Sequence, residues 1–192
     1  MAGKVVTFTN FNLAPSLRLL GLALYGPQAA SHRVRFSQFQ PGLKTREINM
    51  QIQSLLDDSY LRSRFSRTIP SFLPLIKSYC QRIQILNQSD SFDLAIVQSE
   101  LFSFLPSCFE RMLLRIPYIY DFDDAFYLKY RTGRFRYLQP LLGGKFDRMM
   151  SAAVAITAGN LKLTKYASRF NKNVTLLPSV VDTLKLFPNT SK

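Results

Sequence analysis

The residues most able to do chemistry in this chain are three carboxylates that stand close together. Asp121, Asp123 and Asp124 follow the apolar run Tyr118–Tyr120, in a chain with only 12 acidic residues against 25 basic ones. Carboxylates crowded at the end of a buried strand repel one another, so they are typical of places where a ligand, a cation or a proton is handled. One of them could act as a general base or hold sugar hydroxyls. The structural alternative is a solvated turn with an aspartate at a helix N-cap.

The same three aspartates could also bind magnesium. One short loop seldom supplies enough oxygen ligands for that ion, so we expect no metal site. In open α/β sheets, ligands bind at the carboxyl ends of the strands. The cluster therefore predicts a substrate site at such an edge.

A second candidate loop precedes the segment 16–25. Ser16 can cap a helix predicted over that segment, which ends before Gly26 and Pro27. A helix N-terminus together with Arg18 favours an anionic group. The alternative is that Ser16 is only a cap and Arg18 only a surface cation.

A third candidate loop is Thr157-Ala-Gly-Asn160. Gly159 permits a close approach of the backbone, and Asn160 can cap the helix that follows. On physical grounds alone, a glycine and an asparagine in such a loop more often have a structural role than a functional one.

Composition limits the other kinds of site. His32 is the only histidine, and Cys80 and Cys108 are the only cysteines, so a zinc cluster and a disulfide framework are excluded for practical purposes. Neither a phosphate-binding Gly-x4-Gly-Lys-Ser/Thr loop nor a Gly-x-Gly-x-x-Gly dinucleotide motif is present. The net charge of +13 calls for an acidic partner or an anionic surface.

Strand and helix patterns alternate along the chain. Runs of β-forming residues predict strands at 4–9, 32–36, 92–97, 118–120, 154–157 and 174–177. Apolar residues at three- and four-residue steps predict helices at 16–25, from Pro70 or Pro74 to 86, around 102–113 and at 163–170. The segment 41–58 carries no assignable pattern. This alternation predicts an α/β fold with a mainly parallel sheet flanked by helices. No secretory signal and no run of about 18 apolar residues is found, which predicts a cytoplasmic protein.

Four segments resemble the N-terminal half of a GT-B glycosyltransferase of the broad family 4 type. They are the Ala-Pro-Ser-Leu-Arg of 14–18, the strand of 92–100, the Ile-Tyr-Asp-Phe-Asp-Asp-Ala of 119–125, and the Ala-Gly-Asn of 158–160 with the Pro-Ser-Val-Val-Asp of 178–182. The resemblance implies a Rossmann-like acceptor-binding domain over 1–183 and the start of an interdomain linker over 184–192.

The resemblance also implies a reaction and a set of roles. The family transfers a sugar from a nucleotide-sugar donor with retention of configuration, usually without a metal or other cofactor. Asp121 or Asp124 would orient or deprotonate an acceptor hydroxyl, and Asp123, expected on the other face of the strand, ranks below them. Ser16 and Arg18 would face the donor phosphates. Gly159, Asn160 and Asp182 would line the rim of the substrate site.

The donor-binding domain of such enzymes has no counterpart before Lys192. We therefore expect a fragment, one half of a split enzyme or a truncated product, inactive in glycosyl transfer without a donor-domain polypeptide. The expected acceptor is a glycan, a lipid-linked molecule or a small molecule. A binding module for a protein partner, without chemistry of its own, is a further alternative.

The basic residues suggest two other partners. Arg62, Arg64, Arg67, Lys77 and Arg82, beside Phe65, Phe72 and Leu73, could place the protein peripherally on the inner, anionic face of the membrane, or could simply form a solvated helix face. The cations and aromatics that alternate over 129–137 would suit a non-enzymatic nucleic-acid module. No nucleic-acid-binding motif supports that alternative, and the aspartates would repel phosphates.

Overall fold

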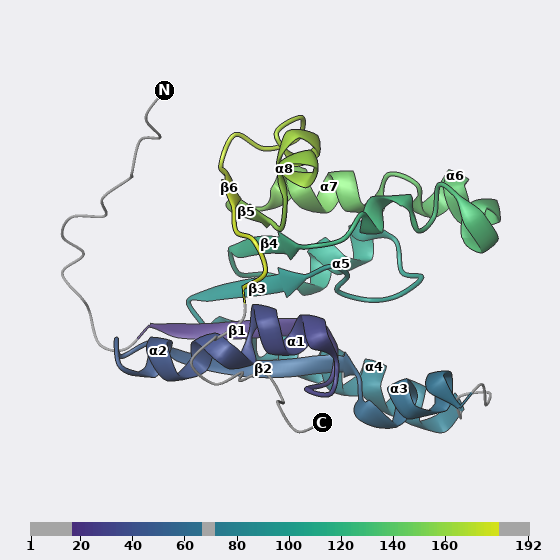
Figure 1. Cartoon of the computed structure of the whole chain (residues 1–192). Coiled ribbons are helices and arrows are strands. Elements are labelled where there is room, and N and C mark those ends of the chain that lie inside the picture. Colours follow the sequence, from purple (N-terminus) through teal and green to yellow (C-terminus); the bar gives the residue numbers. More distant parts are fainter. Residues whose placement is uncertain (1–16, 67–71, 181–192) are drawn as a thin grey trace, which may run out of the picture.

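The computed structural model describes residues 17–66 and 72–180. It contains a single sheet of six parallel strands in the order β2-β1-β3-β4-β5-β6, so the predicted α/β class and parallel sheet are confirmed (Figure 1). The arrangement is that of a Rossmann-like domain. The strands are β1 (Arg18–Tyr25), β2 (Asn49–Leu56), β3 (Leu94–Gln98), β4 (Tyr118–Phe122), β5 (Ala155–Ala158) and β6 (Val174–Leu176).

Helices cover the two faces of the sheet unequally. One face carries α1 (Ala30–Arg35), η1 (Ser37–Phe39) and α2 (Gln40–Lys44), which lie over β1 and β2 (Figure 1). The opposite face carries α4 (Phe72–Asn87), α5 (Ser107–Leu113), α7 (Lys145–Ala152) and α8 (Leu161–Ala167). The remaining helical segments are α3 (Asp58–Phe65), η2 (Ser89–Ser91), η3 (Phe126–Leu128), η4 (Gly133–Leu138) and α6 (Gln139–Leu142). The α1 face over β4 and β5 is therefore left to loops and side chains.

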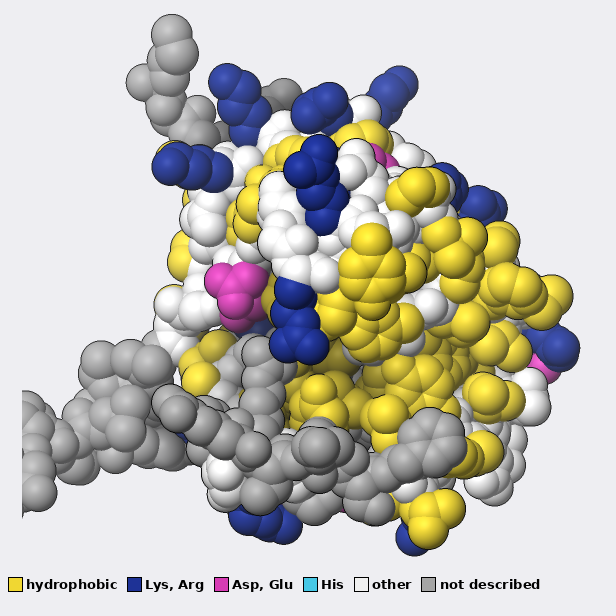
Figure 2. Space-filling model, turned by 90° about the vertical axis from the view of Figure 1, so that its right-hand side faces the viewer, with side chains coloured by type: hydrophobic (Ala, Val, Ile, Leu, Met, Phe, Trp, Pro, Cys, Tyr) yellow, Lys and Arg dark blue, Asp and Glu magenta, His cyan; other side chains and the backbone are white. Residues whose placement is uncertain are grey.

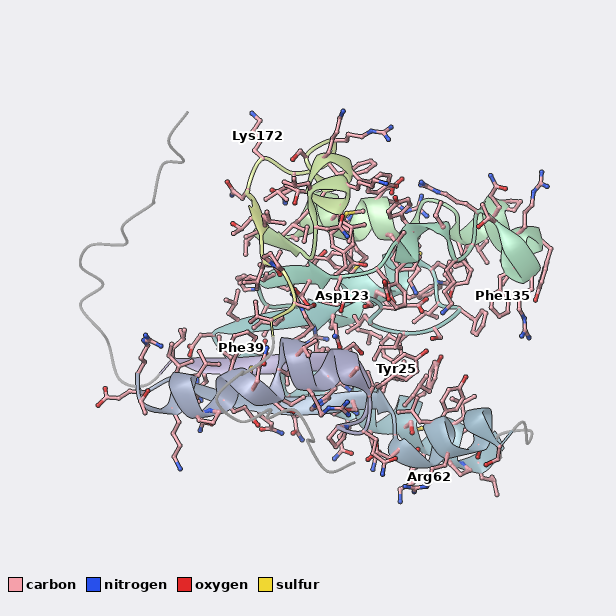
Figure 3. The ribbon with its side chains drawn as sticks, in the orientation of Figure 1. Tyr25, Phe39, Arg62, Asp123, Phe135 and Lys172 are labelled. Carbon is pink, nitrogen blue, oxygen red and sulfur yellow. The ribbon has the colours of Figure 1, made fainter. Side chains whose placement is uncertain are left out.

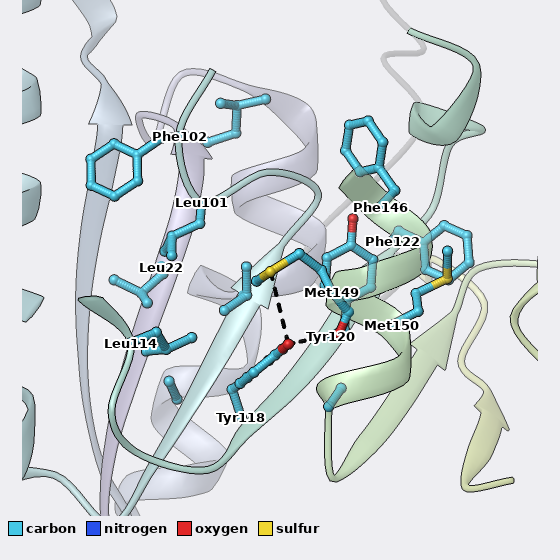
Figure 4. Close-up of a cluster of buried hydrophobic side chains, with 14 of the residues drawn as sticks. Leu22, Leu101, Phe102, Leu114, Tyr118, Tyr120, Phe122, Phe146, Met149 and Met150 are labelled. Atoms are coloured by element: carbon cyan, nitrogen blue, oxygen red, sulfur yellow. Dashed lines mark hydrogen bonds between the residues drawn. The ribbon is translucent and has the colours of Figure 1, made fainter. Parts of the chain in front are cut away.

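The main core lies between the sheet and α4, α5, α7 and α8. Leu22, Tyr120 and Phe122 project from the strands into it, and Phe146 and Met149 meet them from α7 (Figure 4). Tyr118 also belongs to this cluster, and its hydroxyl donates to the Met149 carbonyl at 2.7 Å (Figure 4). Because parallel strands are covered on both faces, their sequences read as nearly continuous apolar runs.

Two elements near the start of the described chain differ from the predictions. The segment predicted as a helix over 16–25 is the strand β1, whose residues Leu19 to Leu24 are buried. The segment predicted as a strand over 32–36 lies mostly in helix α1. An unbroken apolar run fits a buried strand as well as a helix, which explains the first error. The strand predicted over 4–9 lies outside the described residues.

The later elements follow the predictions closely. Strands β3 to β6 and helices α5 and α8 all occur within a few residues of their predicted positions, and α4 begins at Phe72, between the two prolines that bracketed its start. The unassigned segment 41–58 forms α2 and β2, and β2 pairs with β1 at the edge of the sheet.

The segment 62–82, considered as a possible basic surface, is described only in part, with Arg62 and Lys77 exposed and Arg82 not. Arg82 is fully buried, and its guanidinium donates to the carbonyls of Ala23 and Leu101 at 2.6 and 3.1 Å. Leu73 is 75% exposed and Arg62 is exposed. Arg67, and the side chains of Arg64, Phe65 and Phe72, lie outside the described part. Within 17–66 and 72–180, no helix combines the length and the apolar character needed to cross a membrane.

The loop after β3, Ser99 to Phe104, is held by buried side chains. Ser99 and Phe104 have φ angles of 60° and 62°, which residues other than glycine seldom adopt. Hydrogen bonds join the backbone of this loop to the side chains of Tyr79, Arg82, Glu110, Tyr120, Tyr130 and Lys145. These hydrogen bonds fix the conformation of a loop that is neither helix nor strand.

Two glutamates at this loop form a buried charge network with Lys145. The Lys145 ammonium lies 2.9 Å from Glu100 Oε1 and 2.9 Å from Glu110 Oε1. Burial alone would raise the pKa of Glu100, but the cations Lys145 and Lys129 outweigh it, so that pKa is lowered. For Glu110, burial dominates and raises the pKa to about 7.

Candidate functional site

A row of polar side chains crosses the α1 face of the sheet near the carboxyl ends of three strands. Gln98 of β3 is in register with Asp121 of β4, which is in register with Thr157 of β5. Residues paired in this way project from the same face of a sheet. The Thr157 hydroxyl donates to Asp121 Oδ1 at 2.5 Å, so two of the three are joined directly.

Asp121 is neutralised by Arg35, the last residue of α1. The Arg35 Nε donates to Asp121 Oδ2 at 2.9 Å, and Nη2 donates to Oδ1. The two side chains are 2% and 5% exposed. The hydrogen bond and charge of Asp121 outweigh burial and raise the pKa of Arg35. Both oxygens of Asp121 are therefore engaged, which suits an anchor better than a proton acceptor.

Arg35 also binds the chain that leaves β6. Its Nη1 donates to the Leu177 carbonyl at 2.6 Å, and Gln38 Nε2 nearby donates to the Val180 carbonyl at 3.0 Å. The segment Leu177–Val180 thus contacts α1 and η1. It also covers part of the neighbouring sheet face, which carries no helix (Figure 1). One arginine connects α1, β4 and the exit of β6.

Asp123 and Asp124 stand just beyond the end of β4. Asp123 is half-buried and Asp124 is exposed. Burial, with the charges of Asp124 and Asp121, raises the pKa of Asp123, although Arg35 opposes this. Because β4 ends at Phe122, the alternation along the strand from which Asp123 was expected on the other face does not extend to Asp123. A half-buried carboxyl with a raised pKa has the properties of a general base or acid.

Gly159 stands beside Asp123 at the carboxyl edge of the sheet, and Asn160 follows it in the chain. A Cβ on Gly159 would lie 2.8 Å from the Asp123 Cα, so only glycine permits this contact. Asn160 is the N-cap of α8, and its side chain accepts from the Leu163 amide at 3.0 Å, which confirms the predicted cap. An open hollow of about 520 Å³ borders them, lined by Gly159, Asn160, Leu161, Lys162, Leu176 and Pro178.

Arg18, another predicted site residue, does not join this group. Arg18 opens β1 at the amino edge of the sheet, where its backbone amide donates to Asp93 at 2.7 Å. It therefore lies at the opposite edge from the aspartates, because the segment read as a loop and helix is a strand. Ser16 and Asp182 lie outside the described residues.

No sequence pattern singles out Arg35 or Gln98 as site residues. Arg35 was placed in a predicted strand, so its position at the end of a helix facing β4 was hidden. Gln98 is 1% exposed, and its Nε2 donates to the Ser31 carbonyl at 3.2 Å. Its Oε1 has no hydrogen-bond partner in the described structure. A buried orphan acceptor of this kind would accept a bond from a hydroxyl or a water.

The arrangement combines a carboxyl able to exchange a proton with an open hollow nearby. Asp123 has the raised pKa, and Gly159, which approaches Asp123, lines the hollow. Among the described residues, no three histidine, cysteine, aspartate or glutamate side chains are grouped to hold a metal ion. A scan against protein-family models gives no match for this chain, and no curated protein matches its sequence.

Proposed function

We propose that this Rossmann-like domain binds the acceptor of a retaining glycosyltransferase. The sugar would come from a nucleotide-sugar held by a second Rossmann-like unit, which the described residues do not include. The observation that carries the proposal is the half-buried Asp123, with its raised pKa, next to the Arg35–Asp121 pair and an open hollow. Glycosyl transfer needs such a group to orient or accept the proton of the attacking hydroxyl.

The geometry gives the three aspartates different roles under this proposal. Asp123 is the candidate base, because its pKa is raised and its side chain is not fully buried. Asp121 accepts hydrogen bonds from Arg35 and Thr157, and these bonds fix α1 and β5 against β4. Asp124 is exposed and contributes negative charge that raises the pKa of Asp123.

Turnover of nucleotide-sugars is the experiment that tests the proposal. UDP-glucose and GDP-mannose would be offered with membrane and glycan extracts, to this chain alone and with the product of the adjacent downstream gene. Transfer in the mixture alone supports the acceptor-domain role. Transfer by this chain alone contradicts that division of roles. No transfer in either sample, with tight and salt-sensitive RNA binding, favours the nucleic-acid alternative.

A matched pair of variants connects the activity to the site. Asp123→Asn should lower kcat by at least about 100-fold, because general-base catalysis contributes roughly that much. Asp90→Asn, an exposed aspartate in η2, should leave it unchanged. Equal rates for wild type and Asp123→Asn would remove Asp123 from the mechanism.

The nucleic-acid alternative rests on the basic and aromatic residues of 129–137. Tyr130 in that segment is fully buried, and its hydroxyl donates to Glu100 at 2.5 Å. Lys129 pairs with Glu100 and Arg131 with Asp147. Base stacking needs exposed aromatic faces and phosphate binding needs available cations, so these contacts remove Tyr130, Lys129 and Arg131 from that role and weaken the nucleic-acid alternative.

A further inference from the structure

An apolar and basic surface lies on the side of the molecule where the strands end. It is formed by Phe104, Arg134, Phe135, Arg136, Tyr137 and Leu141, and is called here the η4–α6 face. Tyr137 is 74% exposed, Leu141 57% and Phe104 47%. Figure 2 views this side and shows hydrophobic side chains gathered over it, with lysines and arginines around them. Phe135 lies on this side, and Tyr25 at the end of β1 and Asp123 lie further toward the middle of the molecule (Figure 3).

The apolar part of this face is held in place by the protein. Phe104 has a φ of 62°, and its amide donates to the Tyr130 hydroxyl at 2.9 Å. The rings of Phe104 and Phe135 meet edge to face at 5.0 Å, and the Arg134 guanidinium lies 4.8 Å from the Phe135 ring. A bulky residue stays in such a backbone conformation only where its surroundings fix it. The structure therefore maintains an exposed aromatic ring at an energetic cost.

The charge of this segment is of one sign. Between Ala125 and Phe146 the sequence holds five basic residues and no acidic one. Three of the five, Lys129, Arg131 and Lys145, pair with Glu100 or Asp147. Arg134 and Arg136 are exposed, and neither has an acidic partner among the residues that the structure describes. These two arginines are therefore available to an external anion.

We propose that the η4–α6 face docks on an anionic lipid bilayer. A bilayer interface offers phosphate groups to Arg134 and Arg136, and apolar chains to Leu141 and Phe104 within the same few ångströms. Tyr137 has an apolar ring and a polar tip, which suits that depth. A nucleic acid would satisfy the arginines but would leave Leu141 without an apolar partner.

Docking in this way would turn the carboxyl ends of the strands, and with them Asp123, toward the membrane. Lipid binding can be measured without turnover, so the inference does not depend on the proposed activity.

Co-sedimentation of the full chain with vesicles tests the proposal. One set of vesicles is phosphatidylcholine alone, and the other contains about 30% phosphatidylglycerol to supply negative charge. We expect binding to the anionic vesicles only, weakening as salt rises. Absence of binding to the anionic vesicles overturns the proposal. Binding to single-stranded RNA but not to these vesicles overturns it in favour of a nucleic-acid partner.

Two pairs of variants locate the surface. Arg134→Glu/Arg136→Glu should weaken vesicle binding by at least about tenfold. Lys44→Glu/Arg46→Glu makes the same change in net charge on and just after α2, at the other end of the molecule, and should weaken it far less (Figure 1). Equal losses for the two pairs would show a diffuse charge effect and overturn the proposed surface.

The second pair tests insertion of the apolar side chains. Tyr137→Ser/Leu141→Ser should reduce partitioning by at least about tenfold, because each side chain loses apolar burial in the bilayer. Leu17→Ser/Val154→Ser alters two exposed apolar residues elsewhere, at 38% and 48% exposure, and should leave partitioning unchanged. Unchanged partitioning of the Tyr137/Leu141 variant would overturn the apolar half of the proposal. Circular dichroism on all four variants confirms that each is folded.

Discussion

At the scale of single residues, the Arg35–Asp121 pair decides what the aspartate cluster can do. Both groups are buried, and the carboxylate is bound by the guanidinium and by Thr157. A buried charge that loses its partner is strongly unfavourable, whereas removal of both charges together is often tolerated. Loss of one charge of this pair should therefore lower the free energy of unfolding more than loss of both charges.

Arg35→Met should lower the free energy of unfolding by about 3–5 kcal/mol, because it leaves Asp121 buried without its cation. The double variant Arg35→Met/Asp121→Leu should regain part of that loss. Urea unfolding of the two single variants, the double variant and wild type completes a double-mutant cycle. A double variant that is less stable than both single variants would contradict the pairing.

Glu110 should make stability depend on pH. Its pKa in the folded state is raised to about 7 from an ordinary value near 4.5, mainly by burial. Between these values the folded chain keeps a proton that the unfolded chain releases, so stability falls as pH rises through that window.

Glu110→Gln should remove this part of the pH dependence, measured as the urea midpoint from pH 5 to pH 8. Glu47→Gln, at an exposed position, is the control and should keep the wild-type profile. A Glu110→Gln profile as steep as that of wild type would contradict the assignment.

At the scale of elements, the site depends on how closely the β4 and β5 exits approach each other. Gly159→Ala would place a methyl group 2.8 Å from the Asp123 Cα, so the backbone must shift, and we expect a loss of about 1–3 kcal/mol in the free energy of unfolding. Gly42→Ala in α2 meets only the tip of Arg46, at 3.9 Å, and should stabilise slightly. Thermal unfolding compares the two, and equal midpoints would argue against the close approach.

The elements also show where a sequence pattern is enough to predict the secondary structure. β4 and β5 were predicted because each is a short apolar run bounded by clear turn signals, and α8 because its apolar residues repeat at helical steps. β1 was misread because its core-facing and outer positions are both apolar, which removes the alternation that marks a strand. α1 has only six residues, too few for a helical repeat to be distinguished from the spacing of Val34 and Phe36.

At the scale of the whole molecule, the misread first strand explains which site residues were predicted. Asp121, Asp123, Gly159 and Asn160 lie at one edge of the sheet, as predicted, because β4 and β5 were predicted in the right places and the sheet is parallel. Arg35 was missed and Arg18 was misplaced because both lie in elements whose type was wrong. A contact between residues 35 and 121 depends on the packing of α1 across the sheet, which no local pattern encodes.

The net charge of +13 should make the folded molecule sensitive to salt. Like charges repel more strongly in the compact state, and salt screens exposed charges at distances beyond about 10 Å at about 0.1 M. Sodium chloride at about 0.3 M should raise the Tm by a few degrees over low salt, on the order of 2–5 °C. Potassium chloride should act equally if screening is the cause. A Tm that falls with salt would show that attractive surface pairs dominate.

The amide hydrogens of the loop after β3 should exchange with solvent unusually slowly for an irregular segment. The Phe102 amide donates to Glu110 at 2.7 Å and the Phe104 amide to Tyr130 at 2.9 Å, and both acceptors are buried side chains. Opening these amides requires the Lys145 network to separate, not merely a loop to fluctuate. Their deuterium uptake should therefore be as slow as that of strand β3 itself, so that an irregular segment would behave as part of the most slowly opening unit of the protein.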